Sequence, residues 1–181
     1  MEAQPKGYGF SVSHTTRDPR PGEEHGKHYF FAEKEAMQKE IDQGLFLEHA
    51  HVHGNIYGTS IKAVNDVLDQ GKCCILDIDV QGARSVRKSG IKAMFLFVSP
   101  PSFEELEARL RGRGTETEEK IMTRLGNAKG EMDAMEEAGL FDYIMVNDDI
   151  EKAPEVLAQI AKKALSGGGP EKVGSAVRWA Q

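Results

Sequence analysis

Three short apolar runs restrict the fold of this chain more than any other feature of its sequence. Residues 73–78 read CCILDI, residues 93–98 read AMFLFV, and Tyr143–Val146 reads YIMV. Such runs, apolar apart from the acidic end of the first, are typical of parallel strands that are covered on both faces. Helical patterns lie between and after them. The alternation predicts an α/β fold in which helices flank a largely parallel sheet core.

End signals and periodicity predict the remaining elements. Ser60 is placed to cap a helix that runs to Leu68, and Ser102 with Glu105 forms a capping box. Residues 115–118 repeat that capping signature before a helix that reaches about residue 135. Further strands are predicted over residues 8–13, 28–31 and 45–53, and further helices over residues 33–44 and 150–165. Residues 166–181 are rich in glycine, and we expect a disordered tail.

Composition narrows the class of partner. With 181 residues, 39% of them hydrophobic, the chain is large enough for one compact domain. A net charge of −6 argues against general binding to nucleic acid or to a membrane surface. The adjacent Cys73 and Cys74 suit buried, reduced thiols, no apolar stretch approaches membrane-spanning length, and the polar start does not resemble a signal peptide. We therefore expect a cytoplasmic protein.

A phosphate clamp is predicted in the first third of the chain. Arg17 and Arg20 lie in a loop that two prolines stiffen, and two fixed guanidinium groups can bind one phosphate. The alternative is a pair of exposed arginines in surface ion pairs. Tyr29 and Tyr57 can each donate a phenolic hydrogen bond to the same phosphate, although isolated tyrosines more often pack half-buried.

Acidic residues follow the first apolar run. Asp77 and Asp79 lie at its carboxyl end, where open α/β sheets place their ligands. Residues two apart on a strand face the same way, so both acids can line one site. The alternative is that they cap the following helix.

A second cluster of arginines surrounds the acidic stretch TETEE. Arg109, Arg113 and Arg124 flank it, and Gly112 and Gly114 loosen the chain there. A mobile segment that carries arginines can close over a transferring phosphoryl group. The alternative is a set of helix-surface ion pairs with the glutamates.

Three histidines alternate with smaller residues at His49, His51 and His53. The spacing can ligate zinc, but no nearby cysteines or carboxylates complete such a site, so an exposed strand face is the ordinary interpretation and no bound metal is predicted. Glu48 then points to the opposite face and is a candidate for the pocket.

Together these segments resemble the guanylate kinase family. The resemblance rests on FSVSHTTRDPRPGEEHGKHYFF, FLEHAHVHGNIYGTS, CCILDIDVQG, SPPSFEELEARLRGRGTETEEKIMTRL and VNDD, and it covers about residues 7–165 in order. It implies a P-loop-kinase-like fold in one domain over residues 1–165. Within that domain the resemblance implies a mixed-sheet GMP-binding lobe at 13–61, a core at 62–111 and 126–165, and a helical lid at 112–125.

The resemblance also implies a role for individual residues. Those matching the guanine contacts are Ser13, Glu48, Thr59 and Asp79. Those matching the monophosphate clamp are Arg17, Arg20, Tyr29 and Tyr57. The resemblance assigns catalysis to Arg113, Arg124 and Asp79. It assigns ATP binding to Arg109 and Asn147. Glu48 suits its role because a carboxylate can accept from both N1–H and the 2-amino group of guanine, which adenine lacks.

The implied reaction is that of a transferase in purine nucleotide metabolism, in which ATP and GMP give ADP and GDP with Mg²⁺ brought by ATP. One part of the family pattern is not found: the 181 residues contain no G-x-x-x-x-G-K-[ST] loop and no strand leading into one. We therefore expect residues 1–181 to bind GMP but to be weakly active or inactive. We also expect a monomer that can self-associate through an unpaired slot in its sheet.

A non-catalytic function also fits the missing loop. Guanylate-kinase-like modules of membrane-associated scaffolds lack a working phosphate loop and bind partner proteins at the former GMP site. The guanine-reading residues Ser13 and Glu48 favour the enzyme, because a peptide-binding module has no use for them.

Overall fold

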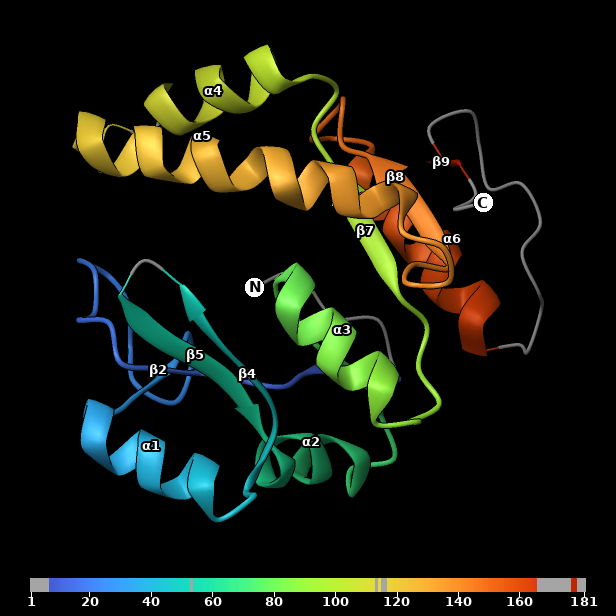
Figure 1. The fold of residues 1–181 in the computed structure, drawn as a ribbon. Helices are drawn as coiled ribbons and strands as arrows, with labels where there is room; N and C mark the ends of the chain where they lie inside the picture. Colours follow the sequence, from blue (N-terminus) through green and yellow to red (C-terminus); the bar gives the residue numbers. More distant parts are fainter. Residues whose placement is uncertain (1–6, 53, 113, 115–116, 166–176, 179–181) are drawn as a thin grey trace. The chain divides into compact units, whose positions relative to one another are not determined.

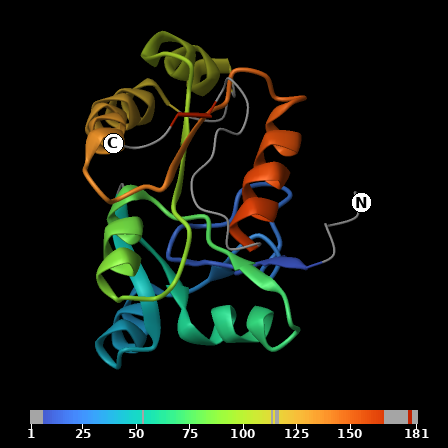
Figure 2. The ribbon, with the colours of Figure 1, turned by 90° about the vertical axis from the view of Figure 1, so that its right-hand side faces the viewer.

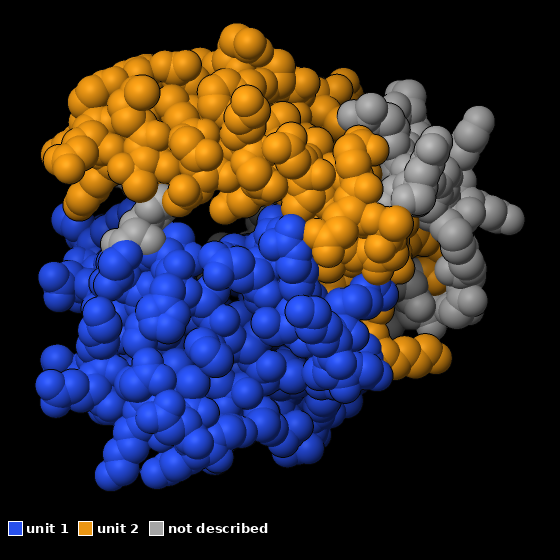
Figure 3. All heavy atoms as spheres, viewed as in Figure 1, with its two compact units in different colours: residues 1–91 blue, residues 92–181 orange. Residues whose placement is uncertain are grey.

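The computed structural model describes residues 7–52, 54–112, 114, 117–165 and 177–178 (Figure 1). The chain forms two compact units, residues 1–91 and residues 92–181, which are coloured separately in Figure 3. Both units combine helices with sheets, so the predicted α/β class is confirmed. No helix among the described residues is long and apolar enough to cross a membrane.

The first unit contains the mixed sheet that the resemblance implied. Its strand order is β3 (Phe30–Phe31), β2 (His14–Thr15), β5 (Asn55–Ser60), β4 (Phe46–Val52). β2 pairs in parallel with β3, whereas β5 runs antiparallel to both β2 and β4. This short, irregular sheet provides the surface on which the candidate site is built.

A second sheet of the first unit holds the first apolar run. β1 (Tyr8–Phe10) and β6 (Cys73–Ile75) pair in parallel, with Tyr8 opposite Cys73. β6 ends at Ile75, so the predicted strand over residues 73–78 is too long, and its three residues are half-buried. The strand is short because the chain turns toward the next helix, α3 (Val80–Lys88), whose N-cap is Asp79.

Three helices complete the first unit. α1 (Lys34–Asp42) buries Met37 completely, and α2 (Ile61–Leu68) begins at the predicted residue. Ser60 Oγ accepts the Ala63 N–H at 3.1 Å, which confirms the predicted cap. α3 packs along β4, as both Figure 1 and Figure 2 show. This packing places the first turn of α3 beside the middle of β4.

The second unit has a parallel pair of strands at its centre. β7 (Leu96–Ser99) pairs with β8 (Tyr143–Val146), and β9 (Val177–Arg178) runs antiparallel to β8. β8 has the predicted bounds, whereas β7 begins three residues later than the apolar run. Tyr143 and Met145 pack against Ile160 of α6 (Ala153–Leu165), which begins at Ala153 instead of residue 150. Residues 166–176 and 179–181 of the predicted tail lie outside the described residues.

Among the described residues of the second unit, two further helices and a short 3₁₀ turn (Ala134–Glu136) are found. α4 (Phe103–Gly112) packs on α5 (Glu118–Asp133) through Leu110, Ile121 and Leu125. The predicted Ser102 cap of α4 is confirmed, because Ser102 Oγ accepts the Glu105 N–H at 3.2 Å. The residue that precedes α5 is Thr117, and its side chain makes no capping hydrogen bond. Residues 115 and 116 of the predicted signature lie outside the described residues.

Candidate active site

One end of the site is an arginine held between aromatic rings and a carboxylate. The Arg17 guanidinium carbon lies 5.4 Å from the centre of the Tyr29 ring and 5.9 Å from that of Phe31. Arg17 Nη1 and Nη2 each donate to one oxygen of Glu23 at 2.9 Å, and the two side chains are only 15% and 17% exposed. A fork-to-fork pair beside two rings fixes the plane of the guanidinium. Arg17 is therefore preoriented.

Glu23 also holds the second arginine of the predicted clamp by its backbone. Its Oε2 accepts the Arg20 N–H at 2.7 Å, and the Glu23 N–H donates back to the Arg20 carbonyl at 3.0 Å. The Arg17 fork, aided by the Arg20 N–H, lowers the pKa of Glu23 to about 2. Glu23 was not among the residues predicted for the site. Its position three residues after Arg20, in a proline- and glycine-rich turn, was the available signal.

Both predicted tyrosines lie beside Arg17. The Tyr29 and Tyr57 rings are 6.1 Å apart at 73°, an edge-to-face arrangement, and both residues are half-buried. Burial raises the pKa of Tyr29, and the charge of Asp77 adds to the rise. Arg17, Tyr29 and Tyr57 are thus brought together, whereas Arg20 is exposed on the same loop.

The other end of the site is a buried carboxyl. Glu48 on β4 is 6% exposed and lies opposite Thr59 of β5, which is fully buried. Among the described residues Glu48 forms no ion pair. Burial, followed by the charge of Asp79, raises the pKa of Glu48. An acid buried without a cation is costly unless a ligand supplies donors to it.

Thr59 lies close enough to Glu48 to oppose part of that rise in pKa through its hydroxyl and backbone. Thr59 Oγ1 nevertheless has no hydrogen-bond partner of acceptable geometry among the described residues. This buried hydroxyl therefore lies beside the buried acid, at the same end of the site. Ser13, another predicted guanine contact, is half-buried, and its carbonyl accepts the Phe30 N–H at 2.9 Å.

The two ends share one face of the β4–β5 hairpin. Glu48 pairs with Thr59 and Ala50 pairs with Tyr57, while His49 and His51 are exposed on the other face. Tyr57 and Thr59 are two residues apart, so their side chains leave β5 about 7 Å apart on the same side. An acid that can read a base and a phenol that can bind a phosphate therefore line one surface.

The acids after β6 do not lie on a strand, because β6 has already ended. Asp79 Oδ1 accepts the Gly82 N–H at 2.8 Å, and Oδ2 accepts from Gln81 Nε2 at 3.3 Å. Asp79 is thus a helix cap, the alternative that the sequence left open, and it still acts on the pKa of Glu48. Asp77 is exposed and acts on the pKa of Tyr29. Each acid is therefore associated with a different end of the site.

In the second unit, Arg109 connects a helix to the end of a strand. Its Nε donates to Glu105 at 2.7 Å and its Nη1 donates to the Asn147 carbonyl at 2.9 Å. The Asn147 side-chain oxygen is buried and has no partner among the described residues. Arg124 on α5 is half-buried, and Arg113 lies outside the described residues.

The predicted ion pairs between arginines and glutamates also occur, but largely through Arg111, which was not among the predicted arginines. Arg111 at the end of α4 donates to Glu107 at 2.8 Å and to both oxygens of Glu118, which begins α5. These bonds connect the two helices on either side of residues 113–117. Arg113, which the lid interpretation requires, lies outside the described residues, so the lid stays a prediction.

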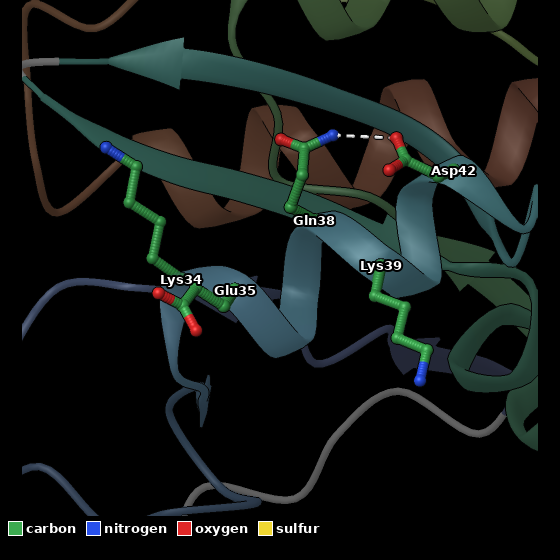
Figure 4. A pocket seen from close by; sticks show the side chains of 5 residues that line it. All are labelled: Lys34, Glu35, Gln38, Lys39 and Asp42. Carbon is green, nitrogen blue, oxygen red and sulfur yellow. Dashed lines mark hydrogen bonds between the residues drawn. The ribbon is translucent and has the colours of Figure 1, made fainter.

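Two other features lie outside this site. An open hollow along α1, lined by Lys34, Glu35, Gln38, Lys39 and Asp42, contains only exposed or half-buried polar side chains (Figure 4). No group of three or more His, Cys, Asp or Glu residues that could hold a metal is found in the described part of the chain. His53 lies outside that part, so of the three histidines considered as zinc ligands only His49 and His51 are described.

Comparison with known proteins identifies the family. The guanylate kinase family profile matches residues 1–164. Guanylate kinase 1 of Oryza sativa subsp. japonica is 60% identical over 166 residues, which are 92% of this chain and 42% of that protein. The guanylate kinase of Sus scrofa is 50% identical over 165 residues, 89% of this chain and 83% of that protein. The chain spans about two-fifths of the length of this Oryza sativa protein and of guanylate kinase 1 of Arabidopsis thaliana, which it also matches.

Comparison with solved structures indicates the same family. The crystal structure of guanylate kinase from Anaplasma phagocytophilum matches with a TM-score of 0.70 and 34% identity, covering 86% of this chain and 74% of that one. The α/β fold with parallel and mixed sheets is thus of the P-loop-kinase-like class. The chain belongs to the guanylate kinase family.

Proposed function

We propose that this chain binds GMP and acts in phosphoryl transfer from ATP to GMP. The observation that carries the proposal is Glu48, a carboxyl that is 6% exposed, forms no ion pair with any described residue and lies beside the fully buried Thr59. A base edge that presents two N–H donors satisfies such an acid, and guanine has this edge. Adenine does not.

The phosphate of GMP is assigned to the other end of the same face. Arg17 supplies a preoriented guanidinium, and Tyr29 and Tyr57 supply hydroxyls. Arg20, exposed on the stiffened loop, is proposed to complete the clamp. Ser13 and Asp79 are proposed to join Glu48 and Thr59 at the base. Arg109, Arg113, Arg124 and Asn147 are proposed to serve ATP and the transferring phosphoryl group.

Mg²⁺ is proposed to enter with ATP as part of the substrate. The chain's own residues are assigned to GMP, ATP and the transferring phosphoryl group, and none of them is proposed as a ligand of the metal. The free thiols Cys73 and Cys74 support a reducing, cytoplasmic setting.

Titration of residues 1–181 with GMP and AMP tests the base assignment. A pocket built to hydrogen-bond its ligand can reject an analogue that lacks the groups by about 10⁴-fold. We expect a strong preference for GMP, and we expect Glu48→Gln to lose most of it, because an amide cannot accept from both donors. Equal affinity of the unsubstituted chain for the two nucleotides would contradict the proposal and favour the scaffold-type binding module.

A further inference from the structure

A glycine in the first turn of α3 lies against the buried Glu48 carboxyl. Gly82 is itself buried, and a Cβ added to it would lie 2.6 Å from Glu48 Oε2 and 3.2 Å from Glu48 Cδ. Contacts under 3.0 Å essentially never occur for a real Cβ atom. The Glu48 carboxyl thus occupies the space in which any other residue would carry its side chain.

The backbone does not account for this glycine. Gly82 does not have a positive φ, and it lies inside a regular helix, where glycine costs about 1 kcal/mol relative to alanine. Its N–H donates to Asp79 Oδ1 at 2.8 Å, a bond that any residue except proline can make. What distinguishes glycine here is the room that it leaves for Glu48.

We propose that Gly82 is a specificity-determining position, which lets the Glu48 carboxyl lie against α3 beside Asp79 and so aims it at a purine edge with two adjacent N–H donors. The inference rests on the proposed function, since it assigns Gly82 to the base end of the GMP site. Gly82 acts through Glu48 and is a positioning residue. The ligand class that it selects is the 2-amino-6-oxopurine nucleotides.

A methyl group at this position should change ligand choice without unfolding the chain. The clashing atom is the far end of a flexible side chain, so Glu48 can move away, although Ile78 Cβ at 3.2 Å must also yield slightly. A displaced carboxyl loses hydrogen bonds that involve a charged group. We expect Gly82→Ala to bind GMP about 10- to 100-fold more weakly and to bind AMP unchanged.

Calorimetric titration of residues 1–181 with GMP and AMP, with melting temperatures recorded alongside, tests the inference. The matched control is Gly130→Ala in α5, where an added Cβ meets nothing within 4 Å. We expect the control to keep the GMP to AMP ratio of the unsubstituted chain. An unchanged ratio in Gly82→Ala overturns the inference. If the unsubstituted chain itself fails to prefer GMP, the proposed function fails instead.

If Gly82→Ala folds poorly, a second pair of variants still tests the inference. In a Glu48→Asp background the shorter acid withdraws from α3, so adding Gly82→Ala should cost much less GMP affinity there than in the unsubstituted chain. Losses that simply add would contradict a role exerted through Glu48.

Discussion

At the scale of single residues, the clamp is asymmetric. Arg17 is largely buried beside the Tyr29 and Phe31 rings and paired with Glu23, whereas Arg20 is exposed on the loop. We expect Arg17→Ala to weaken GMP binding by about 1.5 to 3 kcal/mol, the range for hydrogen bonds to charged groups, and Arg20→Ala to cost less. Calorimetry with GMP measures both.

Guanosine is the control ligand for the clamp, because it lacks the phosphate and should be almost indifferent to either change. Removing Arg17 also leaves the Glu23 carboxylate facing the phosphate. We therefore expect Arg17→Ala combined with Glu23→Gln to recover part of the loss. Equal losses for guanosine and GMP would show that Arg17 supports the fold instead.

Glu48 makes base recognition depend on pH. Burial raises its pKa in the free protein above the ordinary 4.5, and two N–H donors from guanine favour the charged form and lower the pKa again. Because the pKa is raised in the folded protein, the protonated form of Glu48 stabilises the fold. That stabilisation is fully present below pH 4.5 and is lost as the pH rises through the raised pKa of the folded protein. Guanosine should therefore bind more tightly as pH rises from 4.5, with release of a proton, and then level off.

Calorimetry with guanosine in two buffers of different protonation enthalpy measures that proton. Guanosine is preferred to GMP here because a phosphate titrates near pH 6. Glu48→Gln should release no proton. A guanosine affinity that does not vary with pH in the unsubstituted chain would contradict the interpretation of Glu48.

At the scale of elements, helix starts were predicted where a side chain caps the backbone. Ser60 and Ser102 both bond the N–H three residues on, as their spacing indicated. The strand predicted from the first apolar run was too long. Hydrophobicity alone does not show that Asp79 caps α3 and that the extended backbone ends before it. Glu23 was missed because an ion pair across a turn has no periodic signature in the sequence.

The cap of α2 gives a direct test at this scale. Ser60→Ala removes the acceptor for the Ala63 N–H, and we expect the free energy of unfolding to fall by about 1 kcal/mol. The matched control is Thr117→Ala, because the Thr117 side chain makes no capping bond, and it should change stability by only a few tenths of a kcal/mol. Denaturant unfolding measures both. Equal losses would mean that the Ser60 bond contributes nothing.

At the scale of the whole molecule, the class of fold and many of the helices and strands were predictable, whereas β5 (Asn55–Ser60), the partner of β4, and the long-range pairings were not. Local patterns mark a strand, but they do not say which strand lies beside it. The parallel pairing of β1 with β6 brings together residues about 65 positions apart, a separation that no pattern reports. What the resemblance added was a GMP-binding lobe over residues 13–61, which holds most of the predicted guanine contacts and the whole predicted clamp.

Turnover is the remaining test at this scale. The residues proposed to bind GMP are present, but the 181 residues contain no glycine-rich phosphate loop with its lysine. Positioning and electrostatic stabilisation are nearly all that a protein contributes to phosphoryl transfer, and losing one well-placed donor lowers the rate about 10²- to 10³-fold.

We expect residues 1–181 alone to form ADP from ATP and GMP near the background rate. Joining a strand–GxxxxGKS–helix segment ahead of Tyr8 should raise turnover by several orders of magnitude while GMP affinity changes little. A coupled assay on both proteins decides the matter, since fast turnover by residues 1–181 would mean that another segment holds the triphosphate.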